Sequence, residues 1–370
     1  MLVLGIESSC DETGAALVAD GRLIHANIVA SQAEVHARYG GVVPEVASRH
    51  QLSAIIPVLE LALERAGADW SAVDAIAATY GPGLAGSLLV GLSAAKALAW
   101  ARGLPFIGVN HLEAHIYANW LRPPASPPLT AAERAAAAAG AAVPDDPRFP
   151  LLALVVSGAH TELVHIPRHG RYELLGQTRD DAAGEAFDKV GRLLGLGYPG
   201  GPAIQRAADQ RADAPNPFRL PRAWLRGTHD FSFSGLKTAT LQAVEAQRAA
   251  QGDTDPASPL DPAAVTDLAA AFQDAVVDVL AVKTSRAARD LGVTQVVLAG
   301  GVAANTALRA RLAASLDPLG IALRYPPVAL CTDNAAMIAS AASFHLALGE
   351  RDDFALDVAP GLQLPFAIAH

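Results

Sequence analysis

Apolar and polar residues follow the same order in two separate blocks of the chain. In the first block, short apolar runs separated by acidic or glycine-containing turns predict three strands, at residues 2–7, 14–19 and 22–30. The second block predicts three more, at residues 151–156, 161–166 and 172–177. The order repeats although the residues have diverged, which indicates an internal duplication.

Helical periodicity follows the three strands in each block. The first block predicts helix 49–66, strand 73–78, helix 83–101 and strand 105–109. The second predicts helices 183–194 and 263–291, strand 295–299, helix 303–314, strand 322–325 and helix 334–348. Alternating helices and strands predict an α/β protein with two lobes and a cleft between them, where ligands usually bind.

The expected lobes span residues 1–122 and 150–370, with the last helix free to pack back on the first lobe. The intervening residues 123–149 are rich in proline and alanine. They are interpreted as a linker or an insertion that holds at most one frayed helix, over 131–142, and no chemistry of its own.

Composition agrees with this class, because 51% of the residues are hydrophobic, 18% are charged and 5% are aromatic. The formal net charge of −9 repels nucleic acid on average, so any RNA contact requires a local basic patch or a partner protein. One such patch is predicted in a stretch that contains five arginines and only two acidic residues, Asp209 and Asp213. The alternative is that this stretch is a solvated loop. The arginines are Arg206, Arg211, Arg219, Arg222 and Arg226.

The compartment expected from the sequence is the cytoplasm. Acidic residues interrupt the first apolar run at once, which is unlike a signal peptide. The longest apolar stretch, 84–109, is broken by polar residues and is interpreted as a buried helix and strand, not a membrane span. Cys10 and Cys331 form no disulfide framework, as is typical of a reducing compartment.

His111 and His115 are the strongest candidates for chemistry. Histidines four residues apart lie on one face of a helix and can hold a metal ion with a third ligand from elsewhere. Asn110 is suited to cap that helix. The alternative is a pair of solvated histidines. A zinc-protease helix needs Glu directly after the first His, but Leu112 stands there and Glu113 is expected to point off the metal face.

Several loops could hold a nucleotide. Residues 5–14 and 155–160 follow equivalent strands and contain small residues, which let backbone N–H groups approach phosphate; each could also be an ordinary hairpin turn. A double glycine precedes Asn305, which could contact a base or ribose or belong to a tight turn. Asp188 is expected to face a cleft, and 195–202 to form a rigid turn over a ligand. Asp333 is either a helix cap or the third metal ligand.

These motifs together resemble one known family, the tRNA adenosine threonylcarbamoyltransferases. The resemblance runs nearly end to end and lapses mainly at the Pro/Ala segment. It rests on Glu7-Ser-Ser-Cys-Asp-Glu-Thr, Gly40-Gly-Val-Val-Pro-Glu-Val-Ala-Ser-Arg49, Gly81-Pro-Gly-Leu, the His111/His115 pair, Val156-Ser-Gly, Asp180-Asp-Ala-Ala-Gly-Glu-Ala-Phe-Asp-Lys189, Tyr198-Pro-Gly-Gly-Pro202, Phe231-Ser-Phe-Ser-Gly-Leu-Lys237, Ala299-Gly-Gly-Val302 and Cys331-Thr-Asp-Asn334.

The resemblance implies a two-lobed actin/Hsp70/sugar-kinase-like fold made of duplicated ribonuclease-H-like domains around a central cleft. It implies transfer of a threonylcarbamoyl group from threonylcarbamoyl-AMP to N6 of the adenosine 3′ of the anticodon, in tRNAs reading codons that begin with adenine. One divalent metal, iron(II) or alternatively zinc, would bind His111, His115 and Asp333. The adenylate, or an ATP- or ADP-like nucleotide in the same cleft, would bind Val155, Val156, Ser157, Gly158, Ala159, Asp188, Gly201 and Asn305.

A weakly nucleophilic aromatic amine needs a nearby carboxylate, and Glu12 is preferred over Asp11 for this role. The implied partners are tRNA, a paralogous subunit of the same fold and a small P-loop ATPase, with no membrane. The sequence departs from the family at Ala159, where a glycine is usual, and at Asn110, where a histidine is common. Two alternatives stay open: a metallopeptidase, and a non-enzymatic ATP-gated scaffold of the same fold.

Overall fold

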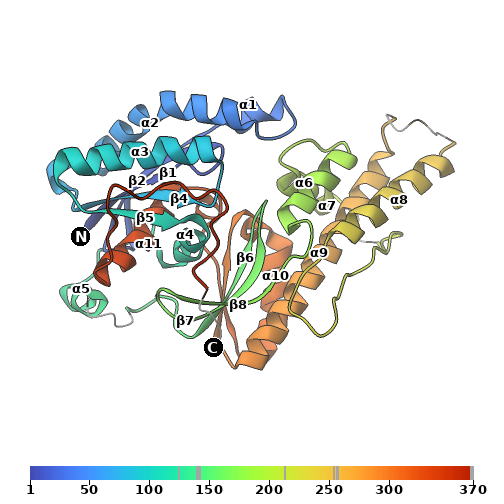
Figure 1. Cartoon of the computed structure of the whole chain (residues 1–370). Helices are drawn as coiled ribbons and strands as arrows, with labels where there is room; N and C mark the ends of the chain where they lie inside the picture. Colours follow the sequence, from blue (N-terminus) through green and yellow to red (C-terminus); the bar gives the residue numbers. More distant parts are fainter. Residues whose placement is uncertain (124–125, 139–142, 212–213, 253–254, 256–257, 367–370) are drawn as a thin grey trace. The chain divides into compact units, whose positions relative to one another are not determined.

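The computed structural model describes residues 1–123, 126–138, 143–211, 214–252, 255 and 258–366. The chain forms two compact units. The first comprises Met1–Phe149, Pro167–Tyr172 and Pro326–His370, and the second comprises Pro150–Ile166 and Glu173–Tyr325. Each unit contains one five-stranded sheet with helices packed on it (Figure 1).

The sheet of the first unit has the strand order β3-β2-β1-β4-β5. Its strands are β1 (Leu2–Glu7), β2 (Glu12–Ala19), β3 (Leu23–Ser31), β4 (Ala75–Gly81) and β5 (Phe106–Asn110). The first three form an antiparallel meander, whereas β4 runs parallel to both β1 and β5. The helices of this unit are α1 (Ala33–Ala37), α2 (Pro44–Ala66), α3 (Ala85–Arg102), α4 (His111–Tyr117), α5 (Ala131–Ala138) and α11 (Ala335–Ala347).

The two faces of β1 carry different side chains, because successive residues of a strand point to opposite sides. Leu4 and Ile6 belong to the apolar core that α2 and α3 form with the sheet. Gly5 lies on the opposite face, against α11. A Cβ atom on Gly5 would overlap the carbonyl oxygen of Ala335 and lie 2.7 Å from the nitrogen of Ala339.

This close approach positions the start of α11. Five alanines of α11 are fully buried, so the helix is apolar on all sides and fills the space over the sheet. Gly14 on β2 supports the same contact, because a Cβ atom there would lie 3.1 Å from the nitrogen of Ala335. Small residues on both elements therefore bring the segment before α11, with Asp333, close to the ends of β1 and β2.

The second unit repeats this strand order as β10-β9-β6-β7-β8. Its strands are β6 (Leu151–Val156), β7 (Thr161–Arg168), β8 (Arg171–Gln177), β9 (Gln295–Ala299) and β10 (Ala322–Arg324). Again the first three strands of the block follow one another, and β9 runs parallel to β6 and β10. The helices are α6 (Ala183–Leu193), α7 (Gly200–Asp209), α8 (Ser234–Ala250), α9 (Pro262–Leu291) and α10 (Thr306–Leu316).

Most strand predictions are confirmed, and those for β1, β6 and β9 agree with the structure at both ends. The prediction of a rigid turn over 195–202 is wrong at its end, because Gly200 opens α7. The predicted helix 303–314 is also displaced: a short 3-10 helix spans Gly301–Ala304, and α10 begins at Thr306. Helices α1, α7 and α8 were not predicted.

The first unit takes in more of the chain than the expected lobe of residues 1–122. Pro326–His370, with α11, belongs to it. So does the Pro/Ala segment, in which Asp146 is buried and forms an ion pair with Arg22 at 2.6 Å. This part of the segment is therefore anchored and does not act as a free linker. Of the frayed helix expected over 131–142, residues 131–138 form α5 and the rest lie outside the described residues.

Among the described helices, none combines the length and the apolar character needed to cross a lipid bilayer.

Candidate functional site

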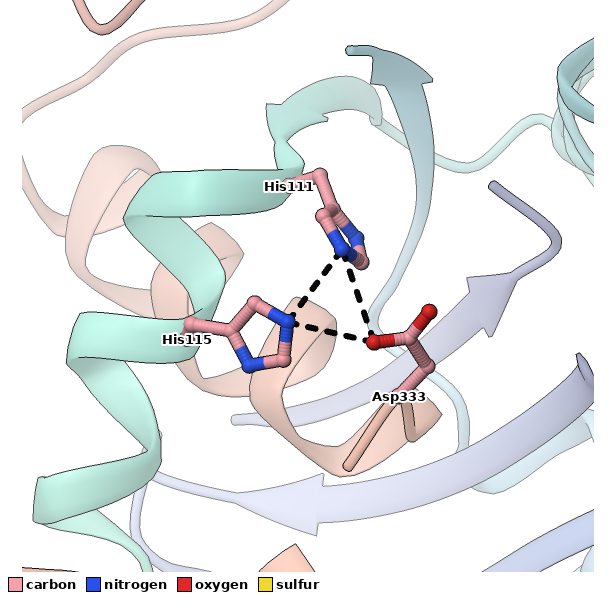
Figure 2. A group of neighbouring side chains, drawn as sticks. All are labelled: His111, His115 and Asp333. Carbon is pink, nitrogen blue, oxygen red and sulfur yellow. Dashed lines mark hydrogen bonds and ion pairs between the residues drawn. The ribbon is translucent and has the colours of Figure 1, made fainter. Parts of the chain in front are cut away.

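The two candidate histidines lie on α4, directly after β5. As predicted, Asn110 caps this helix: its Oδ1 accepts hydrogen bonds from the N–H groups of Leu112, at 2.9 Å, and Glu113, at 3.3 Å. The four-residue spacing places His111 and His115 one turn apart on the same face. Their Nε2 atoms are 3.2 Å apart and point toward the same space (Figure 2).

Asp333 completes this group from the segment before α11. Its Oδ1 lies 3.1 Å from Nε2 of His115 and 3.5 Å from Nε2 of His111 (Figure 2). The three potential ligand atoms lie within 4.8 Å of one another. Asp333 does not cap α11, since Asn334 does so by accepting a hydrogen bond from the N–H of Met337 at 3.1 Å. The capping interpretation of Asp333 is thus wrong.

Glu7, at the end of β1, supports His111 from behind. Its Oε2 lies 3.2 Å from Nδ1 of His111 and accepts a hydrogen bond from the Thr79 hydroxyl at 2.5 Å. Its Oε1 accepts one from the N–H of Ser9 at 2.5 Å. A buried carboxylate on Nδ1 favours the proton there and leaves Nε2 free for a metal ion. Nδ1 of His115 is also buried but has no such partner within the described residues.

Sequence analysis gave no role to Glu7, although one signal was available. An acidic residue at the end of an otherwise apolar strand is rarely buried unless it is paired. The alternation along β1 places Glu7 on the same face as Gly5, toward α11 and α4. Its partner His111 could not be assigned without the fold, because the two residues are far apart in the chain.

The electrostatics of the group suit a divalent cation. Burial acts to lower the pKa of His111, but Asp333 and Glu7 outweigh it and raise the pKa to about 9. Burial acts to raise the pKa of Asp333, yet the two histidines hold it below its usual range. Burial, followed by the charges of Asp333 and Asp11, raises the pKa of Glu12 to about 9. A cation would relieve this crowding of carboxylates, so the residues fit a metal.

The donor set narrows the class of metal. Two imidazole nitrogens and one carboxylate oxygen are the ligands of non-haem iron(II) sites with open positions, and also of catalytic zinc sites. The structure does not support a zinc-protease helix. Leu112 is buried, and Glu113 accepts a hydrogen bond from the Tyr172 hydroxyl and lies 2.9 Å from Nε2 of His345, away from the metal group.

Of the two candidate bases, Asp11 lies in the loop between β1 and β2, and Glu12 is the first residue of β2. The side-chain amide of Gln51 fixes this loop by donating to the carbonyl oxygens of Glu12, at 3.0 Å, and Cys10, at 3.1 Å. The Glu12 carboxylate accepts a hydrogen bond from the Ser31 hydroxyl at 3.2 Å, and its charge acts on His111. Asp11 is half-buried beside it, and its carbonyl oxygen accepts a hydrogen bond from the N–H of Gln32.

The loop after β6 in the second unit is built from backbone groups. Oγ of Ser157 accepts hydrogen bonds from the N–H groups of His160, at 3.1 Å, and Ala159, at 3.3 Å. The side chains of Val155 and Val156 are fully buried, so only their backbone could contact a ligand. The backbone of Ala159 lies outside the left-handed region, so alanine is accommodated there without strain. Gly158 and Ala159 are exposed.

Asp188, Gly201 and Asn305 surround other turns of the same unit. Oδ1 of Asp188 accepts a hydrogen bond from the N–H of Gly200 at 2.7 Å, and burial raises the pKa of Asp188. A Cβ atom on Gly201 would meet open space. Asn305 caps α10 through the N–H of Leu308 and donates to Gln273 at 2.8 Å, so both ends of its side chain already have structural partners.

The predicted residues therefore form two groups. The candidate metal ligands and candidate bases lie in the first unit, and the residues predicted for the adenylate lie in the second. Two sheets with the same strand order define the class as an α/β protein of the two-lobed actin/Hsp70/sugar-kinase-like fold.

Two solved structures match the fold of this chain. Full-length HypF in its phosphate- and nucleotide-bound form matches 94% of this chain with 46% of its own, at a TM-score of 0.57 and 14% identity. HypF from T. kodakarensis also matches 94% of this chain, with 47% of its own chain, at a TM-score of 0.55 and 16% identity.

Sequence relatives identify the family within this fold. A family model described as tRNA N6-adenosine threonylcarbamoyltransferase matches residues 23–136 and 132–340. A protein of that name from Thermomicrobium roseum is 57% identical over 98% of this chain and 97% of its own length. Another from Bacillus subtilis is 50% identical over 98% and 96%. The chain belongs to the tRNA N6-adenosine threonylcarbamoyltransferase family.

Proposed function

We propose that this chain transfers the threonylcarbamoyl group of threonylcarbamoyl-AMP to N6 of the adenosine 3′ of the anticodon, in tRNAs reading codons that begin with adenine. The observation that carries this proposal is the group of His111, His115 and Asp333, which gathers around one point in a chain whose relatives carry the transferase name. Family membership supplies the reaction, and the geometry supplies residues suited to it.

His111, His115 and Asp333 would hold one divalent metal, with iron(II) preferred and zinc as the alternative. An ion with an open position provides Lewis-acid polarisation of an acyl oxygen. Glu7 keeps Nε2 of His111 directed into the site, and the packing of α11 on β1 and β2 keeps Asp333 there. The protein's contribution is thus a preorganised set of three ligands.

Glu12 is proposed to accept the proton of the attacking amine. The amine nitrogen forms a bond to the carbamoyl carbon, the bond from that carbon to the phosphate oxygen breaks, and AMP leaves. With a pKa of about 9 the Glu12 carboxyl group would hold its own proton near neutral pH. It can accept the proton of the amine only when the positive charge of a cation held beside Asp333 lowers this pKa. Asp11 remains the second candidate.

The donor's adenylate is proposed to contact the turns of the second unit. Exposed Gly158 and Ala159 leave backbone groups accessible after β6, and Gly201 leaves open space at the start of α7. Because Asn305 and Asp188 already hold their own turns, they would act on the ligand chiefly by shaping these loops. An ATP- or ADP-like nucleotide would fit the same turns.

The proposed partners are tRNA, a paralogous subunit of the same fold and a small P-loop ATPase. Helices α2 and α3 lie side by side in the first unit (Figure 1). Both expose large apolar side chains suited to a protein contact. Leu52 and Ile56, one turn apart on α2, are 65% and 54% exposed, and Trp100 on α3 is 76% exposed. Cys10 and Cys331 form no disulfide, which suits the reducing cytoplasm, where we place the activity.

A peptidase function finds no support in the geometry, since Glu113 is engaged by Tyr172 and His345. A scaffold function is distinguished by experiment. A strain depleted of this protein should lose threonylcarbamoyladenosine from bulk tRNA, measured by mass spectrometry. The unchanged gene and a His25→Ala control, which alters an exposed histidine outside the site, should restore it, whereas Asp333→Ala should not. Normal threonylcarbamoyladenosine in the depleted strain would contradict the proposed function.

A further inference from the structure

The second unit contains a cavity of about 560 Å³ that has no part in the site described above. One wall is the loop from Trp224 to His229, and the other is the last part of α9, with Lys283, Arg286 and Asp290. The loop comes from the arginine-rich stretch singled out in the sequence and runs beside α9 (Figure 1).

Buried interactions fix the loop wall of this cavity. Lys283, only 4% exposed, donates hydrogen bonds to the carbonyl oxygens of Thr228, at 2.9 Å, and Leu225, at 3.3 Å. Leu225 has φ of 32°, a left-handed conformation that is strained for leucine and is therefore held by its surroundings. Asp230 anchors the end of the loop by accepting from the N–H of Gln177 at 3.0 Å and by pairing with Arg179. The cavity is thus a built feature of the unit.

The charges at the cavity are cationic in a chain of net charge −9. Arg226 and Arg286 are exposed at the cavity, and no ion pair with another described residue engages either of them. Asp290 is the acid among the described lining residues, and Arg289 pairs with it at 3.0 Å.

Other arginines of the same stretch are already paired. Arg211 pairs with Asp267 at 2.7 Å, and Arg222 pairs with Asp278 at 2.8 Å. These two arginines therefore hold the segment on α9, and their charge is neutralised locally. Of the five arginines in the predicted patch, Arg226 is the one that lines this cavity.

We infer that this cavity is a tRNA-binding site, in which Arg226 and Arg286 contact backbone phosphates and Trp224 stacks on an unpaired base. Trp224 lines the cavity and is 37% exposed, so part of its ring is accessible. An indole beside two guanidinium groups is the combination that binds RNA loops, since phosphates pair with arginine and every base has a face for stacking. The inference rests on the proposed function for its substrate.

The test measures binding of unmodified tRNA by labelled-tRNA anisotropy between 50 and 300 mM KCl. Each phosphate contact on an unpaired strand contributes about 0.7 to the slope of log K against log salt. The double variant Arg226→Ala/Arg286→Ala should therefore lower the slope by about 1.4, which at 0.15 M salt corresponds to roughly 15-fold weaker binding. Both side chains are exposed, so their loss leaves folding unaffected.

Trp224 gives an independent measurement with a different signature. Trp224→Ala should weaken binding about 5-fold or more with an unchanged salt slope, because stacking does not depend on counterion release. Trp224→Phe keeps an aromatic face and should bind within about 3-fold of the unchanged protein. The matched control is Arg65→Ala/Arg351→Ala, which removes the same charge from two exposed positions outside the cavity and should keep the slope.

The outcomes separate this inference from the proposed function. Unchanged affinity and slope in the Arg226/Arg286 variant, in a protein that still modifies tRNA, would overturn the cavity as the binding site. The same holds if the control pair lowers the slope equally, or if the unchanged chain binds no tRNA at 50 mM salt. A variant that binds tRNA normally but loses a protein partner would place an acidic protein surface in the cavity instead. Failure of the proposed function would appear separately, as absence of transfer by the unchanged protein.

Discussion

The two units share one strand order but differ at the equivalent ends of their first strands. The first strand of the first unit ends in Glu7, and that of the second unit ends in Val156. Both side chains are fully buried. Glu7 pairs with His111 of the candidate metal group, whereas Val156 belongs to the apolar core. The end of the first strand thus carries a carboxylate in the first unit and an apolar side chain in the second, where only the backbone at this position could contact a ligand.

The turns around these strand ends remain alike. A glycine turn follows the fourth strand of each block and packs on the loop after the first. A Cβ atom on Gly83 would lie 2.5 Å from the carbonyl oxygen of Ser9, and one on Gly300 would lie 2.5 Å from that of Val156. Glycine at both places permits backbone to approach backbone. The repeat therefore keeps its packing while its chemistry is set by the side chains at the strand ends.

The largest effect is expected from Glu12→Gln at the start of β2 in the first unit. Loss of a general base typically lowers the rate by about 10²- to 10⁴-fold, and the isosteric amide should keep metal and donor binding. Single-turnover transfer and equilibrium binding, measured together, distinguish the roles. If Glu12 only ordered the turn, rate and binding would fall in parallel. A near-normal rate would favour Asp11, which Asp11→Asn tests under the same conditions.

The Glu7→Gln substitution tests whether the carboxylate at the end of β1 is needed for metal binding in the first unit. The change keeps the shape but removes a charged acceptor from Nδ1 of His111. Loss of such a supporting group typically lowers metal affinity by about 10- to 100-fold. Competition with a chelator measures this affinity. Unchanged affinity would mean that His111 is oriented by α4 alone.

Gly5→Ala tests the packing that brings Asp333 to the histidines. The added methyl group would overlap the backbone of α11, so α11 must shift. Overpacking of this kind costs about 1–3 kcal/mol of the free energy of unfolding, and metal affinity should fall with it. Gly235→Ala is the matched control, because a Cβ atom there meets open space. It should change the free energy of unfolding and the free energy of metal binding by no more than about 1 kcal/mol each.

Ala159→Gly should have the smallest effect and concerns the second unit alone. Alanine is accommodated at this position without left-handed strain, so glycine should lower stability by about 0.4–1 kcal/mol through the unfolded chain. If the methyl group narrows the loop, donor affinity should rise while metal content stays constant. Unchanged donor affinity would show that the exposed methyl does not meet the ligand.

Sequence patterns were sufficient for elements whose signal is local. The apolar runs of β1, β6 and β9 define their own ends, and Asn110 and the histidine spacing define α4. Helix α7 was missed because Gly-Gly-Pro usually interrupts a helix, whereas here Ile204 and its neighbours are buried and the packing stabilises the helix.

Contacts between distant segments could not be predicted in the same way. The family resemblance implied that Asp333 joins the two histidines. The physical reason why Asp333 lies beside them is the close packing of α11 on Gly5. The pairing of Glu7 with His111 depends on the same fold. Nor could the sequence tell that Arg211 and Arg222 are neutralised by acids of α9 while Arg226 lines a cavity, because the partners lie about 56 residues away.

Metal content tests the central claim most directly. His115→Ala removes one of the three ligands while leaving the cores of both units in place, so elemental analysis of the purified variant should find the metal largely lost. His25→Ala, in which an exposed histidine is removed from β3, should keep the metal content of the unchanged protein. Full metal occupancy in a folded His115→Ala protein would contradict the assignment of His111, His115 and Asp333 as one site.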